Sequence, residues 1–289
     1  MNKLMYSAPL YFVAFLPMII MLYQLCPQKF RKFVLLLANY AFFFIWSKFF
    51  LVYQVITMLI TYVSAKVIDH TANKKTKKIS LFIAIVINLG VLIVLKYTNF
   101  FGENIFAIFH QPFTPVRLIA PIGISYYTLQ MISYLMDTSS GKIHSDHSIV
   151  DFAVYASFFP TLIQGPITRF NEIKDSIHAG NPITYQNLKF GSQRILFGLM
   201  KKMIIADRLD PAVSKIFTSY TQDGLFSLIG AVLCTIQLYM DFSGIVDICL
   251  GSAEIFGIKL PENFRQPFFA ENASDFWRRW HITLGTFLR

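Results

Sequence analysis

Apolar runs long enough to cross a bilayer recur in the first hundred residues, and short polar segments separate them. The first predicted span covers residues 8–25, and a basic segment follows at 29–32. Apolar sequence then continues over 33–65, which is too long for a single span of about 20 residues. The polar pair Ser47-Lys48 interrupts this run, so two helices joined by a tight turn are expected. A fourth span is predicted over residues 79–95.

The basic segments predict an orientation in the membrane. Residues 29–32 and 74–78 are two predicted crossings apart, and both are rich in Lys or Arg. Positively charged loops favour the cytoplasmic side, so both segments are placed there and the N-terminus is placed outside. Residues 96–117 are mixed aromatic and polar and contain Pro112 and Pro115, which predicts an interfacial segment on the outer side.

The middle of the chain predicts helices that are not simple spans. Residues 119–136 are expected to form a membrane helix whose Ser125, Thr128 and Gln130 need polar partners inside the bundle or in a wet cavity. Residues 152–163 are too short to cross in the ordinary way and contain Pro160. A re-entrant or broken helix is therefore expected there.

Two further helical stretches follow a polar loop predicted at 175–187. Residues 190–209 are expected to form an amphipathic helix that Pro211 ends. A basic stripe recurs on it every seven residues: Arg194, Lys201 and Arg208. Residues 225–256 are mostly apolar, and polar positions around Gly244 predict a division into two pieces.

Residues 261–289 are the densest polar and aromatic stretch of an otherwise apolar chain. Asn272 or Ser274 can cap a helix predicted over 275–288, because a side-chain oxygen there accepts a bond from a free backbone N–H. At about 100° per residue, one face carries Trp277, His281, Leu284 and Leu288. The other side carries Arg278, Arg279 and Arg289, with Asp275 one turn before Arg279. This is the pattern of a basic amphipathic helix at a membrane interface.

Composition agrees with these patterns. Hydrophobic residues make up 55% of the 289 residues and charged residues 15%, and the mean hydropathy is +0.51. Soluble domains carry about a quarter charged residues. The predicted fold class is therefore all-α, a polytopic transmembrane helical protein with broken or re-entrant helices and interfacial amphipathic helices. No linker interrupts the chain, so residues 1–289 are expected to form a single domain.

The charge, cysteine and histidine patterns exclude several function classes. The net charge of +10 lies in short segments between apolar runs, so nucleic-acid binding is not expected. Cys26, Cys234 and Cys249 are too widely spaced for a disulfide framework or a zinc site. His144 and His147 lie in a polar loop without further ligands, so no metal is expected. The sequence also lacks glycine-rich nucleotide loops and the GxSxG motif.

Several polar residues can carry chemistry, and each has a second interpretation. Asp241, Asp247 and Glu254 stand in an apolar run, where they either act in a site or form a salt bridge with an arginine that holds the bundle together. His281 is either a general base, since an ordinary imidazole has a pKa of about 6.5, or a hydrogen-bonding residue that shapes a tunnel. Five cations bind either donor phosphates or anionic lipid headgroups: Arg194, Lys201, Lys202, Arg278 and Arg279.

Six ordered motifs lie between Pro121 and Ile282. They are Pro121 to Gln130, Ser157-Phe-Phe-Pro160, Gly165-Pro-Ile-Thr-Arg169, Gly198 to Arg208, Tyr239-Met-Asp-Phe-Ser-Gly244, and the Pro261 to Ile282 stretch with Ser274-Asp-Phe-Trp-Arg-Arg-Trp-His281. Together they strongly resemble the membrane-bound O-acyltransferase family. Within it, the most similar branch is the bacterial one with the membrane subunit of alginate O-acetyltransferase, and the D-alanyl transfer proteins of teichoic acid synthesis come next.

The resemblance implies an O-acyltransferase in a bacterial plasma membrane. Members of the family move an acyl group, here expected to be acetyl, from a cytoplasmic thioester to an exported cell-envelope polysaccharide, often through an extracytoplasmic partner protein. Acetyl-coenzyme A is the first expected donor, and an acyl or aminoacyl carrier protein is the second. No bound cofactor is expected.

The resemblance also implies roles for individual residues. His281 is expected to support catalysis beside a tunnel formed with Asp241, Ser243, Trp277 and Trp280. The donor side is expected to carry Lys201, Lys202, Arg278 and Arg279. The family's second landmark histidine, generally taken as the base, has no counterpart before Arg289, and Gly285 stands where relatives often have serine. The 289-residue chain is therefore expected to be catalytically incomplete.

Two other function classes stay open at this point. A transporter or export channel would account for Asp241, Asp247 and a broken helix, but it predicts inverted repeats that the hydropathy pattern does not show. The other class is a non-enzymatic membrane scaffold that recruits an extracellular transferase.

Overall fold

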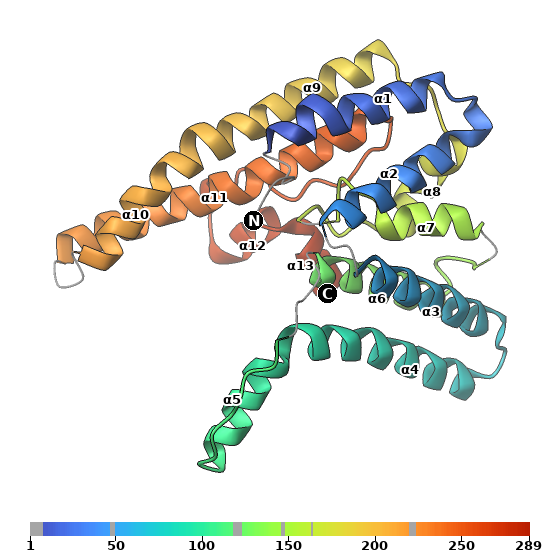
Figure 1. Ribbon diagram of the computed structural model, residues 1–289, viewed down its shortest axis with the longest axis horizontal. Helices are drawn as coiled ribbons and strands as arrows, with labels where there is room; N and C mark the ends of the chain where they lie inside the picture. Colours follow the sequence, from blue (N-terminus) through green and yellow to red (C-terminus); the bar gives the residue numbers. More distant parts are fainter. Residues whose placement is uncertain (1–7, 47–49, 118–122, 146–147, 163, 220–223) are drawn as a thin grey trace. The chain divides into compact units, whose positions relative to one another are not determined.

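The computed structural model describes residues 8–46, 50–117, 123–145, 148–162, 164–219 and 224–289. These residues form α-helices joined by short turns, and none of them lies in a β-strand (Figure 1). The α-helices are α1 (Leu16–Leu25), α2 (Arg31–Trp46), α3 (Phe50–His70), α4 (Lys74–Leu92), α5 (Thr98–Ile108), α6 (Ile124–Ser139), α7 (Ile149–Ser157), α8 (Phe170–Ala179), α9 (Tyr185–Leu199), α10 (Asp207–Ser219), α11 (Gly224–Ile255), α12 (Ala273–Arg279) and α13 (Ile282–Leu288). The prediction of an all-α fold is confirmed.

Short π- and 3₁₀-helical turns extend several of these helices. The π-helical turns are η1 (Tyr11–Phe15), η3 (Ile93–Tyr97) and η4 (Met200–Ala206), and the 3₁₀ turns are η2 (Gln28–Phe30) and η5 (Pro267–Phe269). The predicted break between the second and third spans fits α2 and α3, which end and begin on either side of it. The turn at Ser47-Lys48 itself lies outside the described residues.

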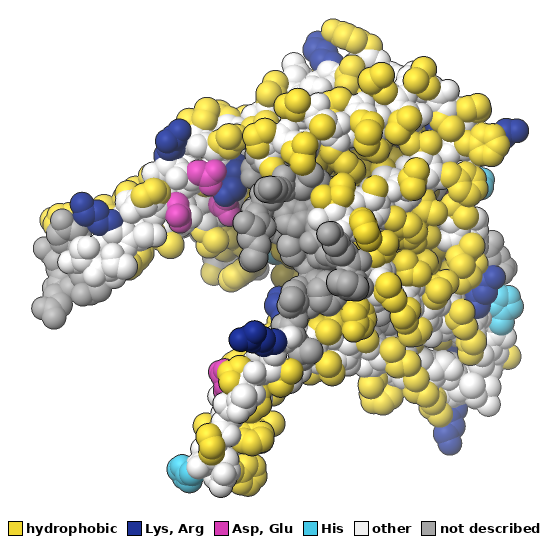
Figure 2. All heavy atoms as spheres, viewed as in Figure 1, with side chains coloured by type: hydrophobic (Ala, Val, Ile, Leu, Met, Phe, Trp, Pro, Cys, Tyr) yellow, Lys and Arg dark blue, Asp and Glu magenta, His cyan; other side chains and the backbone are white. Residues whose placement is uncertain are grey.

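Several described helices are long and apolar enough to cross a membrane. They are Leu51–His70, Lys74–Ile108 and Gly224–Ile255, and Tyr11–Leu25 is a shorter apolar stretch. Many large apolar side chains on these stretches are exposed, for example Val13, Phe82 and Leu228. Figure 2 shows hydrophobic side chains spread over most of the visible surface. A surface this apolar suits lipid rather than water.

The contacts divide the chain into two compact units. The first unit contains Met1–Val34, Gln164–Thr168 and Asp175–Arg289, and the second contains Leu35–Ile163 and Arg169–Lys174. In the second unit α3, α4 and α6 pack against one another, and α7 packs against α3 and α6. Its core is aromatic: Tyr134, Phe152, Tyr155 and Phe170 are buried with ring centroids 4.5–6.3 Å apart.

The second unit also confirms the predicted broken helix. α7 ends at Ser157, and the non-helical residues that follow it, such as Phe158 and Phe159, are buried in protein. Asn39 replaces part of the missing helical bonding, because its side chain donates to Val154 O (3.2 Å) and accepts from Phe159 N (2.9 Å). Irregular backbone is thus kept away from lipid, as membrane proteins require.

The polar face predicted for residues 119–136 is confirmed in part, and residues 119–122 lie outside the described residues. Thr128 and Gln130 of α6 are buried within the second unit, while Ser125 is partly exposed and accepts a hydrogen bond from Lys96 Nζ at 3.0 Å. Gln130 Nε2 donates to Tyr155 O at 3.3 Å, and Tyr155 Oη donates to Gln130 O at 3.3 Å. These two bonds tie α6 to α7 and satisfy groups that would be costly in hydrocarbon.

The first unit is built on the antiparallel pair α9 and α11. Four glycines let the two backbones approach closely, since a Cβ on Gly191 would lie 2.6 Å from Gly251 O and a Cβ on Gly198 would lie 2.5 Å from Gly244 O. The two glycines on each helix are seven residues apart. The prediction that the apolar run divides near Gly244 is therefore wrong. α11 is one continuous helix of 32 residues, and its glycines are packing positions rather than breaks.

Three other predictions of boundaries are wrong. α8 occupies part of the predicted 175–187 loop, because Phe170, Ile173 and Ile177 recur at helical spacing and are buried. Pro211 lies inside α10 rather than ending a helix. Pro211 has no backbone N–H to donate, yet α10 follows η4 directly and the helical stretch continues past the proline to Ser219.

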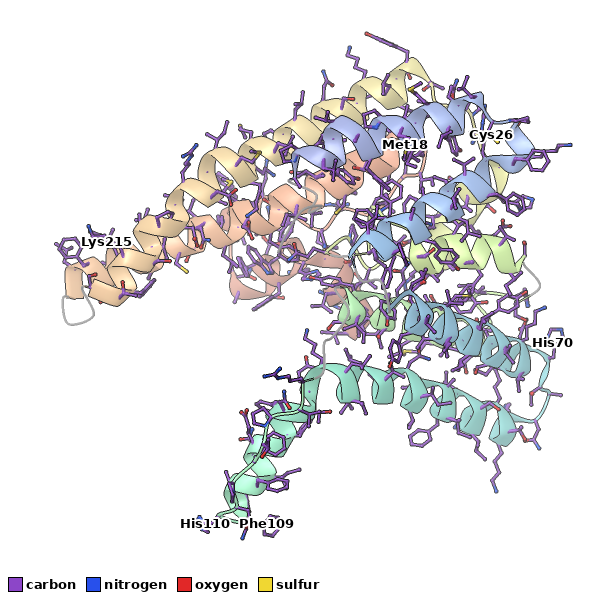
Figure 3. All side chains as sticks on the ribbon, in the orientation of Figure 1. Met18, Cys26, His70, Phe109, His110 and Lys215 are labelled. Carbon is purple, nitrogen blue, oxygen red and sulfur yellow. The ribbon has the colours of Figure 1, made fainter. Side chains whose placement is uncertain are left out.

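The third wrong boundary concerns residues 96–117. The helix does not end near Leu95 but continues through η3 and α5 to Ile108, and Phe109 and His110 lie at its far end (Figure 3). Residues 111–117 then run back along α5. Asn99 fixes them in place, because its side chain donates to Val116 O (3.0 Å) and accepts from Val116 N (2.9 Å).

Candidate functional site

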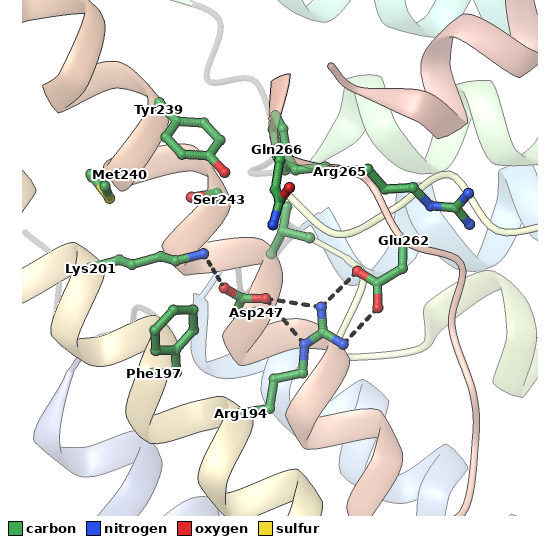
Figure 4. Close-up of a pocket in the computed structure, with 12 residues that line it drawn as sticks. Arg194, Phe197, Lys201, Tyr239, Met240, Ser243, Asp247, Glu262, Arg265 and Gln266 are labelled. Carbon is green, nitrogen blue, oxygen red and sulfur yellow. Dashed lines mark hydrogen bonds and ion pairs between the residues drawn. The ribbon is translucent and has the colours of Figure 1, made fainter. Parts of the chain in front are cut away.

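A cluster of four charged side chains lies between α9 and α11 in the first unit (Figure 4). Asp247 faces α9 and accepts bonds from Arg194 Nε (3.1 Å) and Nη2 (3.0 Å) and from Lys201 Nζ (2.7 Å). The Arg194 guanidinium also forms a bidentate salt bridge with the Glu262 carboxylate, with both N–O distances at 2.6 Å. We call Arg194, Lys201, Asp247 and Glu262 the charge cluster. Its formal charges sum to zero.

A cavity of about 430 Å³ opens beside the charge cluster. Its apolar walls include Phe197, Tyr239 and Phe264, and its polar lining includes Ser243 and Gln266 in addition to the charge cluster. The Ser243 side chain is 2% exposed, and its hydroxyl has no hydrogen-bond partner among the described residues. The cavity thus combines apolar walls with a buried hydroxyl, a combination common in small-molecule sites.

Asp241 has a different environment from Asp247. Lys202 Nζ lies 2.6 Å from Asp241 Oδ1 and 2.6 Å from Asp207 Oδ1. Burial lowers the pKa of Lys202, but hydrogen bonds to Asp207 and Asp241 outweigh it, so the net shift is upward. Of the two interpretations of the acidic residues, the structure shows internal salt bridges for both Asp241 and Asp247. Asp241 pairs with a lysine rather than with an arginine.

The predicted helix over 275–288 is broken in its middle. α12 ends at Arg279, Trp280 is extended, and His281 has φ 46° and ψ 54°, in the left-handed region that non-glycine residues rarely adopt. Contacts with the 263–265 strand-like segment hold the break: Arg265 N donates to Arg279 O, and Ile282 N donates to Asn263 O, each at 3.0 Å. Helical periodicity could not reveal these tertiary bonds.

The break changes which residues surround His281. Its Nδ1 lies 3.2 Å from Asn263 Oδ1, and its ring packs edge-on against Phe242 with centroids 5.0 Å apart. Trp277, predicted on the same face, is 63% exposed. Burial lowers the pKa of His281, which favours the neutral imidazole near pH 7.

Of the other residues named from the sequence, some form contacts within the protein and others are exposed. Trp280 joins an aromatic cluster and contacts Tyr239, Phe264, Phe268 and Phe276. Asn272 caps α12 as predicted, and Asp275 pairs with Arg279 at 2.8 Å. The hydrogen bond from Arg279 lowers the pKa of Asp275. Arg278 and Arg208 are exposed.

The comparisons with known proteins agree with the motifs. The sequence model of the membrane-bound O-acyltransferase family matches residues 69–289. The chain belongs to the membrane-bound O-acyltransferase family. It is therefore a membrane protein, as its apolar helices indicate.

Curated relatives specify what this chain resembles. A probable alginate O-acetylase, AlgI, of Pseudomonas aeruginosa is 34% identical over 293 residues, which cover 99% of this chain and 56% of the relative. A peptidoglycan O-acetyltransferase of Helicobacter pylori is 34% identical over 99% of this chain and 60% of its own length. A teichoic acid D-alanyltransferase of Bacillus subtilis is 31% identical over 62% of this chain and 46% of its own. The chain thus spans little more than half the length of the first two relatives.

The structure brings three further residues to the site that the sequence patterns did not reveal. They are Glu262, Asn263 and Thr283. Glu262 and Asn263 belong to the Pro261-Glu-Asn-Phe264 motif, so a signal existed. Polar residues after a proline commonly form turns, however, and only the fold shows that these two face Arg194 and His281.

Proposed function

We propose that the protein is an integral-membrane O-acyltransferase that passes an acetyl group from a cytoplasmic thioester to an exported cell-envelope polysaccharide. Membership of the family supports the acyl transfer. Two relatives are named for acetylation of alginate and of peptidoglycan, and this supports both the acetyl group and the polysaccharide acceptor. The protein is placed in a bacterial plasma membrane with its N-terminus outside.

The observation that carries this proposal is the contact of 3.2 Å between His281 Nδ1 and Asn263 Oδ1. An amide oxygen only accepts hydrogen bonds, so the proton in the 3.2 Å contact belongs to His281 Nδ1. In a neutral imidazole the Nε2 lone pair is then free to accept a hydrogen bond from a hydroxyl or thiol. His281 can thus orient a reacting group near neutral pH.

The proposed reaction forms one bond and breaks another at the thioester carbonyl carbon. The acceptor hydroxyl oxygen attacks the thioester carbonyl carbon, a C–O bond forms, the C–S bond breaks, and the hydroxyl proton ends on the departing sulfur. His281 Nε2 accepts a hydrogen bond from the O–H group and so aligns its oxygen with the carbonyl carbon. Alignment of this kind lowers barriers by several kcal/mol in general, on the order of a thousandfold in rate.

The cavity beside the charge cluster is the proposed place for the donor's thioester arm. Its volume of about 430 Å³ suits an arm rather than a whole coenzyme. Phe264 lines the cavity, and its ring contacts Phe242, which in turn contacts His281. Acetyl-coenzyme A is the first proposed donor and a carrier protein the second. Lys201 and Lys202 already pair with carboxylates, so donor phosphates would compete with Asp247 and Asp241 for them.

The test uses the chromosomal gene that encodes this sequence. Acetate released from the cell envelope by mild base is measured in the wild type, in a gene deletion and in a H281A strain. We expect the deletion to remove most O-acetate and H281A to reduce it at equal protein level. Unchanged O-acetate in the deletion would overturn the proposal.

A second acyl group is favoured by one specific observation, the match to a teichoic acid D-alanyltransferase. The same alkaline extract distinguishes the two chemistries, since it releases D-alanine instead of acetate if an aminoacyl group is transferred. Purified membranes with labelled acetyl-coenzyme A separate an enzyme from a scaffold or transporter. Label that moves to glycan or protein supports the enzyme, whereas binding without transfer supports the scaffold.

A further inference from the structure

Asn263 is a hydrogen-bond hub directly behind His281. Its side chain is completely buried, and its Oδ1 accepts from Thr283 N (3.1 Å), Thr283 Oγ1 (2.8 Å) and His281 Nδ1 (3.2 Å). The backbone N–H of Thr283 can only donate, so the atom that it meets must be the amide oxygen and not the amide nitrogen. The orientation of the Asn263 amide is therefore fixed by its surroundings.

The hub is anchored to a second, distant part of the sequence. Thr283 Oγ1 donates to Asn263 and accepts from Ile167 N at 3.1 Å. Ile167 belongs to the Gly165-Pro-Ile-Thr-Arg169 motif, and it is buried. Asn263 O also accepts from Ile282 N at 3.0 Å. Backbone and side-chain bonds on both sides thus prevent Asn263 and Thr283 from moving independently of His281.

We propose that Asn263 is a positioning residue that holds His281 as its Nδ1–H tautomer, with Thr283 and Ile167 keeping the Asn263 oxygen in place. This inference rests on the proposed function, because it explains how His281 presents the Nε2 lone pair to a reacting hydroxyl. A neutral amide suits this task. A carboxylate at the same place would accept the same bond but would also favour the charged imidazolium, whose Nε2 has no lone pair to offer.

The direct test is the tautomer of His281 in the protein purified in detergent. ¹⁵N-histidine NMR distinguishes a protonated from an unprotonated ring nitrogen, and the His281 signals are identified by their loss in H281Q. We expect Nδ1–H and bare Nε2 in the wild type. In N263L the acceptor is gone, so the Nε2–H tautomer is expected to increase. N104L is the matched control, since Asn104 is exposed on α5 and its side chain donates, among the described residues, to Phe100 O of its own helix.

Acyl transfer provides the second readout. N263L is expected to lower O-acetate transfer by about 100-fold, because most of the alignment that His281 provides is lost. N263D keeps an acceptor, so it is expected to retain the Nδ1 proton while the imidazole titrates at higher pH and the pH profile of transfer moves upward. A purely structural role would lower activity without changing the tautomer or the profile.

A second pair of variants applies if N263L does not fold. T283V removes the hydroxyl that links Ile167 to Asn263, and T286V removes an exposed hydroxyl that, within the described part of the chain, bonds to Ile282 O of its own helix. T283V is expected to broaden the His281 signals and reduce transfer by about tenfold relative to T286V. An unchanged tautomer and unchanged transfer in N263L, or in T283V where N263L is unfolded, would overturn the inference. If cells that carry the intact chromosomal gene transfer no acyl group, the proposed function fails, whereas the NMR result still decides the role of Asn263.

Discussion

The first unit contains two polar clusters, one of charged side chains and one of uncharged side chains. The charge cluster joins two cations and two carboxylates through bonds of 2.6–3.1 Å, and each charged group pairs with another member of the cluster. The second cluster, Asn263, His281 and Thr283, is neutral, and we call it the histidine cluster. The charge cluster leaves no unmatched charge, whereas the histidine cluster leaves the His281 Nε2 lone pair available.

This difference indicates a division of roles. Intramembrane charges are usually taken as functional by default, yet in this protein the charged residues fix α9 against α11. His281, the residue that we propose for the chemistry, has a pKa lowered by burial and sits at a helix break. Substitutions in the charge cluster should therefore change stability first, and substitutions in the histidine cluster should change activity first.

The largest effect on stability is expected for D247A. It leaves the Arg194 and Lys201 charges without their common partner, and the loss of one member of a buried pair costs about 3 kcal/mol. Arg194 is 35% exposed, so water relieves part of this cost. Thermal unfolding in detergent measures the effect. D210N is the control, because the bond that Asp210 forms among the described residues is an exposed one with Gln237, and a change within about 0.5 kcal/mol is expected. Equal stability of D247A and wild type would remove the distinction between the clusters.

The next effect tests the close approach of α9 and α11 that the charge cluster needs. G198A puts a methyl group 2.5 Å from Gly244 O, so the helices must separate. Overpacking of this kind costs about 2 kcal/mol. In the same assay, G90A is the matched control, because nothing lies within 4 Å of a Cβ there and alanine suits the interior of α4. If G198A were as stable as G90A, the glycine contacts would not be important for packing.

A smaller effect concerns pH and the histidine cluster. Burial lowers the pKa of His281 in the folded protein, so the unfolded chain binds the proton more readily. The stability that His281 contributes is fully present above the unfolded value of about 6.5 and is lost as the pH falls through the folded pKa. The unfolding midpoint is compared at pH 7.5 and pH 5 in the wild type and in H281Q. The wild type should lose more on acidification, and an equal loss in both proteins would contradict a buried neutral imidazole.

The smallest effect is expected at the partly exposed pair on α12. Arg279 donates to Asp275, and this hydrogen bond lowers the pKa of Asp275. The contribution of the pair is present above the ordinary aspartate range and is lost as the pH falls through the lowered pKa. Since the pair is screened by solvent and salt, D275N should change the unfolding midpoint less than any variant above, and still less in high salt. A larger effect for D275N than for G198A would reverse the proposed ranking.

Local sequence patterns predicted a large part of the fold. Apolar runs gave the spans, Pro160 gave the interrupted helix after α7, and Asn272 and Asp275 gave the start of α12. Each of these depends on neighbours within one or two turns. The same reasoning placed Arg194 and Lys201 on one stripe, and both indeed reach Asp247. Arg208, one repeat further, is exposed after the π-helical turn η4, because a π turn shifts the register of the residues that follow it.

The remaining features depend on contacts between distant residues. The left-handed His281 arises from backbone bonds to Asn263 and from the bridge between Phe264 and Trp280. The continuity of α11 through Gly244 depends on Gly198 on another helix. Periodicity along one segment contains no information about such partners. The role of Asn263 was missed for the same reason, since an asparagine after Pro-Glu looks like an ordinary turn residue.

The length of α11 has a consequence for the bilayer around this protein. At about 1.5 Å per residue its 32 residues extend about 48 Å, well beyond a hydrocarbon layer of about 30 Å. Residues from Ser243 onward are mostly buried in the first unit, while most residues before Tyr239 are exposed. Only the N-terminal half of α11 therefore has to match the thickness of the membrane. A thinner bilayer should tilt that half, and a thicker bilayer should cover more of it. Asp247 and the groups around it should not be affected by the mismatch.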